Sequence, residues 1–228
     1  MKAAVYGGTR NLYEDMVTAA KSLLIHSDVE KIYFLTEDDV FPYRIPNCIE
    51  PINVRGQKWF SERGPNYKRK WTWMVLMKAA LSKVLPDCDK VLSLDVDTIV
   101  IDDISELWDL TLGQNYLAGC REPLKSKTRL YVNMGVAMMN LDQLRDGMDD
   151  RIIHALNTRS YEFAEQDCIN KFCGGGILEI DGMYNVCDYT VKSDGRKIVH
   201  FAAKNNWNTH PTVKKYKQIP WEEIRGGI

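Results

Sequence analysis

The chain has 228 residues, of which 45% are hydrophobic, and a chain of this length and composition can form one domain with a sizeable core. Its formal net charge of −1 and its short basic clusters give no indication of nucleic-acid binding. The sequence shows neither a signal-peptide pattern nor an apolar run long enough to span a membrane, so we expect a cytoplasmic protein with no transmembrane segment.

The apolar pattern predicts strands that alternate with helices. Strands are predicted over residues 2–6, 31–35, 49–54, 90–94, 98–101, 116–120, 131–141 and 197–201. Helices are predicted over residues 13–24, 71–84, 142–158 and 161–173. Such an alternation implies a single α/β domain with a largely parallel sheet, in which ligands bind at the carboxyl ends of the strands.

Asp95 and Asp97 follow the apolar strand that begins at Lys90. In extended backbone, residues two apart point to the same face, so both carboxylates can turn toward one bound object. Two like charges this close repel each other unless a cation or a basic group lies between them. The pair therefore predicts a cation site where a buried strand leaves the core.

Three other places in the chain suit a ligand. Gly7 and Gly8, between a strand and a helix, would allow close approach to the backbone, but they also suit an ordinary tight connection. Lys78 lies on an apolar helical stripe, so its amine reaches solvent, forms a structural ion pair, or meets a phosphate or an active-site acid. Asn133 and Gly135 interrupt an apolar strand, which indicates either a docked ligand or a structural asparagine.

His200 lies near the end of the last predicted strand, so it can meet Asp95 and Asp97 at one edge of a parallel sheet. Two carboxylates and one imidazole make a mixed oxygen and nitrogen site that suits Mn²⁺ or Mg²⁺ better than structural zinc. The six cysteines lack the paired spacing of a zinc knuckle or a redox motif. The natural task of such an ion is to hold a diphosphate leaving group.

Five segments of the chain, taken in order, resemble the family 8 glycosyltransferases, the retaining GT-A-fold group that includes glycogenin and bacterial lipopolysaccharide galactosyl- and glucosyltransferases. The segments are VYGGTRNLYEDMVTAAKSLL, LPDCDKVLSLDVDTIVIDDISELW, YVNMGVAMMNLDQL, EQDCIN and IVHF. The resemblance implies one GT-A-type, Rossmann-like domain over residues 1–205, with a mostly parallel central sheet flanked by helices. Residues 206–228 would form a C-terminal tail or lid rather than a second domain.

The same resemblance implies a metal-dependent retaining hexosyltransferase with a UDP-sugar as donor. The acceptor would be a saccharide, a lipid-linked glycan or a protein, and a homodimer is one possible assembly. Asp95, Asp97 and His200 would bind Mn²⁺, with Mg²⁺ as the alternative, and the bound ion would hold the diphosphate of the donor.

Further site residues are carried over from the resemblance. The residues expected to bind the donor are Gly7, Gly8, Thr9, Tyr13, Lys78, Asp95, Val96, Asn133, Gly135 and Lys204. Tyr13 would stack on the uracil base. Lys78, Glu165 and Gln166 would be catalytic, because they would stabilise charge on the leaving UDP and on the oxocarbenium-like sugar.

Two motifs depart from the family pattern. Glu165 stands where the family usually has the shorter aspartate, and the late motif has Ala203 in place of glycine and Lys204 nearer to the histidine. Two alternatives therefore stay open. One is a non-catalytic sugar-nucleotide binder, because the late motif is incomplete. The other is a HAD-type phosphatase, although that class normally carries its Asp-x-Asp motif on the first strand.

Overall fold

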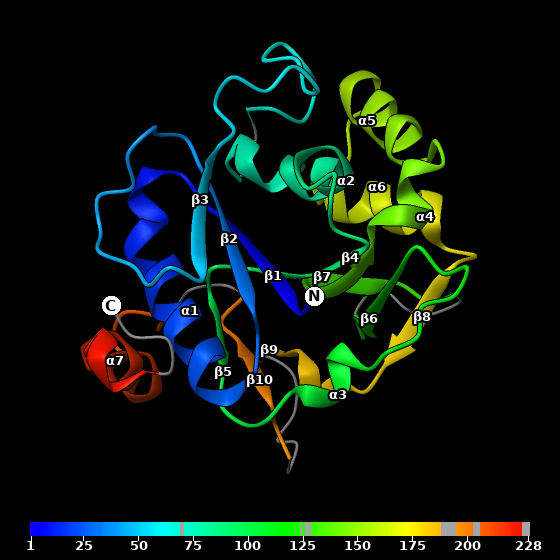
Figure 1. The fold of residues 1–228 in the computed structure, drawn as a ribbon. Helices are drawn as coiled ribbons and strands as arrows, with labels where there is room; N and C mark the ends of the chain where they lie inside the picture. Colours follow the sequence, from blue (N-terminus) through cyan, green and yellow to red (C-terminus); the bar gives the residue numbers. More distant parts are fainter. Residues whose placement is uncertain (69–70, 124, 126–128, 188–194, 203–205, 225–228) are drawn as a thin grey trace.

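A central sheet of seven strands, in the order β3-β2-β1-β4-β7-β6-β8, organises the protein (Figure 1). The computed structural model describes residues 1–68, 71–123, 125, 129–187, 195–202 and 206–224. The strands of the sheet are β1 (Ala3–Gly7), β2 (Lys31–Thr36), β3 (Ile49–Asn53), β4 (Lys90–Leu94), β6 (Leu117–Arg121), β7 (Val132–Asn140) and β8 (Ile177–Ile180). β7 is antiparallel to both of its neighbours, and the other adjacent pairs are parallel. The predicted α/β fold with a mostly parallel sheet is confirmed.

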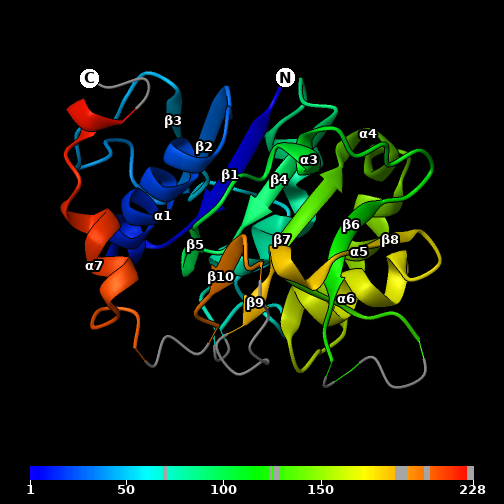
Figure 2. The same ribbon diagram turned by 90° about the horizontal axis from the view of Figure 1, so that it is seen from below.

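Alternate side chains of the central strands enter two separate apolar cores, as the pleat of a strand requires. On β1, Ala3 and Val5 belong to one core, and Ala4 and Tyr6 belong to the other. The elements over the first core are the 3₁₀ helix η2 (Trp73–Ala80), α2 (Leu81–Val84), α4 (Leu141–Arg145), α5 (Met148–Thr158) and α6 (Ala164–Cys173). The second core is covered by α1 (Tyr13–His26), which follows the short η1 (Arg10–Leu12), and by α3 (Ser105–Trp108). Figure 2 shows α1 and the group α4, α5 and α6 on opposite sides of the molecule.

A second, three-stranded sheet brings the late histidine to the first sheet. It has the order β5-β10-β9, with bounds Thr98–Val100, Ile198–His200 and Val186–Cys187. β10 is antiparallel to β5, and this register sets His200 opposite Thr98. The backbone N–H of Phe201 also donates to Asp97 O at 2.8 Å. His200 therefore reaches the two aspartates from a separate sheet and not from the central parallel one.

Two predicted helices differ from the observed ones. Residues 71–84 were expected to form one helix, but η2 is a 3₁₀ helix that continues into the short α2. Because a 3₁₀ helix has three residues per turn, Val75 and Lys78 lie on one side, and both line the pocket described below. The predicted helix over residues 142–158 is divided into α4 and α5 by Gly147, whose φ of 83° is left-handed.

The sequence pattern missed β8 and β9, which follow the three glycines at residues 174–176. Only the short η3 (Gly182–Tyr184) separates these two strands. β9 has two residues, which is too short to leave a periodic pattern in the sequence.

The C-terminal tail lies against α1. Helix α7 (Pro211–Gln218) buries Val213 and Tyr216, and the tail ends on the short η4 (Trp221–Glu223). The Tyr216 hydroxyl lies 2.7 Å from His26 Nε2, and Lys21 Nζ donates to a tail carbonyl at 2.7 Å. Within the described residues 206–224, none lines the pocket described below. The assignment of this segment as a tail or lid stays a prediction.

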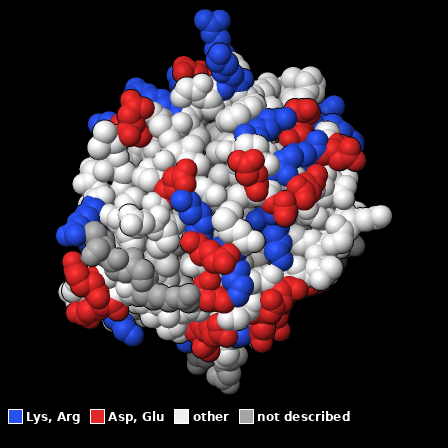
Figure 3. All heavy atoms as spheres, viewed as in Figure 1, with Lys and Arg blue, Asp and Glu red and all other residues white. Residues whose placement is uncertain are grey.

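The surface carries charges of both signs. On the face in Figure 3, acidic and basic side chains lie next to one another in several places, with areas free of charged side chains between them. Among the helices that the structure describes, none is long and apolar enough to cross a membrane.

Candidate functional site

A cavity of about 750 Å³ lies where β1 and β4 end and β7 begins. Because β7 is antiparallel, its amino end meets the carboxyl ends of β1 and β4 at this edge of the sheet. The lining residues are Gly7, Asn11, Leu12, Trp71, Thr72, Val75, Lys78, Asp95, Val96, Asp97, Glu122, Asn133, Phe163, Glu165, Gln166, His200 and Ala202. A cavity of this size is typical of a small-molecule site.

Asp95 and Asp97 lie in a turn directly after β4 rather than in the strand itself. The turn is held at both ends, because Asp95 N–H donates to Gly135 O at 2.8 Å and Thr98 Oγ1 donates to Asp95 O at 2.7 Å. The sequence argument for a shared strand face was therefore wrong in its geometry. The turn still directs both carboxylates toward His200.

Asp95, Asp97 and His200 could hold a metal ion. His200 Nε2 lies 3.5 Å from Asp95 Oδ2 and 3.4 Å from Asp97 Oδ1, and one ligand atom from each residue falls within 4.8 Å of the others. In the part of the chain that the structure describes, no other cluster of acids, histidines and cysteines has this spacing. Neighbouring ligands of an octahedral ion with bonds of about 2.1 Å lie about 3 Å apart, so the three donors fit such an ion with small adjustments.

The electrostatics of the cluster also favour a cation. Burial alone would lower the pKa of His200, but its hydrogen bond to Asp97 and the charges of both aspartates outweigh burial and raise this pKa to about 10. The imidazole is therefore protonated at neutral pH when no metal ion is present. The same carboxylate charge that holds this proton would attract a divalent cation.

Lys78 supplies a positive charge beside the aspartates, on a half-buried side chain. Its Nζ donates to Asp95 Oδ1 at 2.5 Å and to Met134 O at 2.8 Å, and it lies 3.9 Å from Glu165 Oε1. Burial lowers the pKa of Lys78, but the charges of Asp95 and Glu165 outweigh burial and raise it above the ordinary value. The structure thus places Lys78 in a charge network at the cavity, rather than on the surface.

Glu165 and Gln166 lie in the first turn of helix α6 and line the cavity. Burial raises the pKa of Glu165 to about 7, although Lys78 acts to lower it. Gln166 Oε1 accepts the backbone N–H of Met134 at 2.9 Å, and its Nε2 donates to the Tyr131 hydroxyl at 3.2 Å. The backbone at Ala164 has a φ of 35°, which is left-handed and unusual for a residue other than glycine. This local strain lies directly before the two predicted catalytic residues.

Asn133 and Gly135 support His200. A Cβ at Gly135 would lie 2.1 Å from His200 Cε1, so the space that the missing side chain leaves is filled by the imidazole ring. The Asn133 amide is bound to Gly135, Asn185 and Glu122. Asn133 also lines the cavity, but Gly135 does not belong to its wall. The predicted donor contact of Gly135 stays a prediction, and the glycine has a clear packing role.

Of the residues predicted to bind uridine, some line the cavity and others do not. Gly7 lines the cavity, with Asn11 and Leu12 beside it, but Gly8, Thr9 and Tyr13 are not in its wall. The Tyr13 ring is fully buried and packs on Phe41 at 5.0 Å between ring centroids. The ring has no exposed face in this structure, and the stacking of Tyr13 on a uracil base stays a prediction. Its hydroxyl instead holds the segment after β2, by accepting from Glu37 N–H at 2.9 Å.

Several wall residues are not among the site residues that we predicted from the sequence. They are Asn11, Leu12, Trp71, Thr72, Val75, Glu122, Phe163 and Ala202. The rings of Trp71 and Phe163 lie 5.5 Å apart and form an aromatic section of the wall. Such residues carry no spacing signal, because they meet only after the chain folds. The predicted donor residue Lys204 lies outside the described residues.

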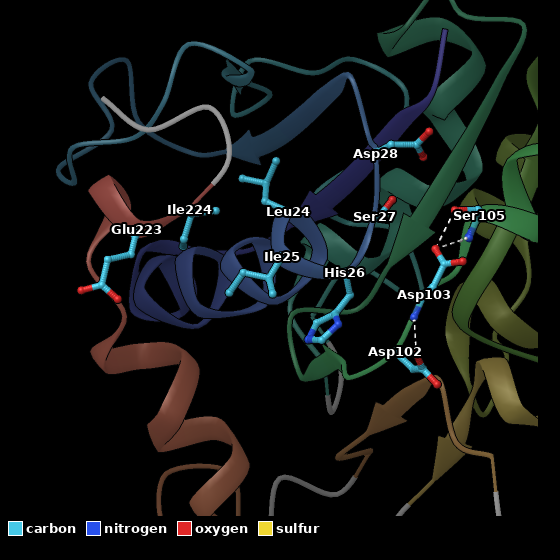
Figure 4. A pocket seen from close by; sticks show the side chains of 10 residues that line it. All are labelled: Leu24, Ile25, His26, Ser27, Asp28, Asp102, Asp103, Ser105, Glu223 and Ile224. Carbon is cyan, nitrogen blue, oxygen red and sulfur yellow. Dashed lines mark hydrogen bonds between the residues drawn. The ribbon is translucent and has the colours of Figure 1, made fainter.

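A second cavity of about 560 Å³ lies near the end of α1 (Figure 4). Its wall includes His26, Asp28, Asp102 and Asp103. Asp103 Oδ1 already accepts hydrogen bonds from Ser105, through its backbone N–H at 3.1 Å and its hydroxyl at 2.6 Å. This cavity lacks the grouped ligand atoms of the first one, so we assign the functional site to the cavity with Asp95, Asp97 and His200.

An α/β domain with two aspartates after a central strand and a distant histidine beside them has the arrangement of a GT-A-fold glycosyltransferase. The sequence model of Glycosyl transferase family 8 matches residues 6–218, and the chain belongs to this family. The match does not agree with the alternative of a HAD-type phosphatase.

The chain is similar to other proteins over most of its length. It is 28% identical over 264 aligned residues to the glycosyltransferase GlyE of Streptococcus pneumoniae, which covers 97% of this chain and 60% of that protein. It is 26% identical to the lipopolysaccharide 1,2-glucosyltransferase of Escherichia coli, over 59% of this chain and 51% of that protein. The chain thus spans little more than half the length of these relatives.

The fold is similar to that of the galactosyltransferase LgtC, which was solved in complex with donor and acceptor sugar analogs. The TM-score is 0.77 at 19% sequence identity, and the match covers 96% of this chain and 98% of that one. This likeness shows the shared fold.

Proposed function

We propose that the chain is a metal-dependent retaining glycosyltransferase that moves a hexose from a UDP-sugar to a saccharide, a lipid-linked glycan or a protein. The observation that carries the proposal is the grouping of Asp95, Asp97 and His200 with Lys78 and Glu165 around one cavity of a family 8 protein. The glycosyltransferase names of GlyE and of the Escherichia coli relative support the same class of reaction.

The metal ion of the proposal is Mn²⁺, with Mg²⁺ as the alternative. Two carboxylate oxygens and one imidazole nitrogen suit these ions, and the positions they leave open would suit phosphate oxygens. When bound, the ion would supply positive charge to the diphosphate of the donor. Asp95, Asp97 and His200 would hold it.

In the proposed reaction, the bond between the sugar and the diphosphate breaks and a bond to the acceptor hydroxyl forms on the same face. The acceptor proton passes to the leaving phosphate, so the balance needs no further reactant. Lys78 would favour charge on the leaving UDP, because its ammonium group lines the cavity beside Asp95 on a side chain that is 13% exposed. Glu165 and Gln166 would face the sugar. The burial of Glu165 and the hydrogen bond that Gln166 accepts from Met134 would fix their positions before the substrate binds.

The test is a panel of UDP-sugars with Mn²⁺, in which UDP release and glycoside formation are measured separately. The proposal expects one UDP-hexose to give metal-dependent release, and the product to keep the anomeric configuration of the donor by NMR. The His200→Gln variant should lose this activity, and a Gly182→Ala variant should keep it, because nothing lies within 4 Å of a Cβ at Gly182. Metal-dependent binding without release or transfer would support the non-catalytic binder instead.

A further inference from the structure

A buried row of amide groups holds His200 from behind. His200 Nδ1 lies 2.9 Å from Asn185 Oδ1, and Asn185 Nδ2 donates to Asn133 Oδ1 at 3.0 Å. The same Asn133 oxygen accepts the backbone N–H of Gly135 at 2.8 Å. The side chains of this row belong to residues that are at most 9% exposed, so they depend on one another for hydrogen bonds.

The direction of one hydrogen bond in this row is fixed, and it determines the directions of the other hydrogen bonds. A backbone N–H can only donate, so the Asn133 atom next to Gly135 must be the oxygen. This oxygen cannot donate, so Asn185 must present its NH₂ group to it. The carbonyl oxygen of Asn185 then faces His200, and the ring must carry a proton on Nδ1.

We propose that Asn185 is a positioning residue, which keeps a proton on His200 Nδ1 and so leaves the Nε2 lone pair available to a divalent cation. Nε2 is the ring nitrogen that faces Asp95 and Asp97. A hydrogen bond at one ring nitrogen of a metal-binding histidine fixes both the tautomer and the ring orientation. The inference rests on the proposed metal site, and it does not depend on the transfer reaction.

Two further contacts fit this role. Cys187 Sγ also lies near His200 Nδ1, but at 3.8 Å it is a weaker partner than Asn185. At the other end of the row, Asn133 Nδ2 donates to Glu122 Oε2 at 3.0 Å, and Glu122 lines the cavity. The row therefore links the metal side of the cavity to a carboxylate in its wall.

The test is calorimetric titration with Mn²⁺ alone, without nucleotide. The Asn185→Ala variant should bind Mn²⁺ roughly 10 to 100 times more weakly, as is usual when a hydrogen-bond partner of a metal ligand is lost. The Asn185→Asp variant should bind more tightly than Asn185→Ala, because its carboxylate still accepts from Nδ1. Equal affinity of the unsubstituted and Asn185→Ala proteins would overturn the role of Asn185.

The matched control is Asn66→Ala. Asn66 is also buried, and both ends of its amide are bonded, to the carbonyls of Leu156 and Arg159 and to the N–H of Tyr161. This variant should lose stability but keep its Mn²⁺ affinity. A similar loss of affinity in both variants would show a general structural effect and overturn the proposal.

A second readout needs no substitution at Asn185. Long-range ¹H–¹⁵N spectra of the unsubstituted protein with saturating Mg²⁺, assigned with a His200→Gln variant, should show the proton on Nδ1. A proton on Nε2 would overturn the proposal. Failure of the unsubstituted protein to bind any Mn²⁺ would overturn the metal site itself, and this outcome differs from equal binding by the two proteins.

Discussion

Replacing Gly135 by alanine should remove His200 from the metal site. The added Cβ would lie 2.1 Å from His200 Cε1, 2.5 Å from Nδ1 and 2.9 Å from Asn133 Oδ1. Ordinary carbon contacts are about 3.5 Å, so the ring must move by roughly 1.4 Å. Metal–ligand distances tolerate only about 0.2 Å, so a movement of this size removes Nε2 as a ligand.

The assay for this variant is Mn²⁺ binding by calorimetry, together with the free energy of unfolding from chemical denaturation. Gly135→Ala should lose at least tenfold in Mn²⁺ affinity and about 1–3 kcal/mol in stability, the usual cost of overpacking a core. Gly56→Ala is the control, because nothing lies within 4 Å of a Cβ there. Mn²⁺ affinity in Gly135→Ala equal to that of the control would refute the close packing of Gly135 on His200.

Three other substitutions test separate parts of the structure. Lys78→Met leaves the Asp95 and Glu165 carboxylates without their cation. Because the Asp95 side chain is 33% exposed, the metal-free protein should lose about 1–3 kcal/mol of unfolding free energy, the usual cost of removing one partner from a polar contact. A loss under about 1 kcal/mol would contradict the ion network. Burial raises the pKa of Glu165 from 4.5 to about 7, so the unfolded chain ionises first and stability falls as pH rises between these values. In denaturation curves, the free energy of unfolding of Glu165→Gln should therefore rise relative to that of the unsubstituted protein as the pH is raised from 4.5 to 8. A difference between the two proteins that does not change with pH would contradict this. Tyr216→Ala should lower the free energy of unfolding by about 3–5 kcal/mol, because it leaves a cavity where the buried ring of α7 packs. It should leave the Mn²⁺ affinity unchanged. A large change in affinity would give the tail a direct role at the site.

The metal cluster was predictable because its chemistry appears in residue types. Asp95 and Asp97 follow an unusually apolar strand, and His200 ends another, so their charges stand out against their surroundings. The position of His200 in a separate, mixed sheet was not predictable, because β9 and β10 have two and three residues. Strands this short obtain their register from tertiary contacts rather than from periodicity.

Gly135 and Tyr13 show what the fold adds to a reading of a single sequence. A glycine in an apolar strand indicates that something lies close to the backbone, and only the fold reveals that this is the ring of His200. Tyr13 occupies a position expected to contact the donor base, but the packing of Phe41 buries its ring. In both cases the neighbour that decides the role is distant in the sequence.

The hydrogen-bonded row Asn133–Asn185–His200 also joins residues that are distant in the sequence. Asn133 was recognised as a buried amide that needs partners, but Asn185 lies 52 residues further along the chain and has no motif around it. Its role depends on the direction of hydrogen bonds, which only coordinates define.

Calorimetric binding of UDP, with Mn²⁺ and with a chelator, is the most direct measurement of the proposed site. The unsubstituted protein should bind UDP only with the metal ion, and Asp97→Ala should lose this metal-dependent binding while Gly56→Ala keeps it. Unchanged Mn²⁺-dependent binding of UDP to a folded Asp97→Ala protein would contradict the role of Asp95, Asp97 and His200 as the site that holds the diphosphate.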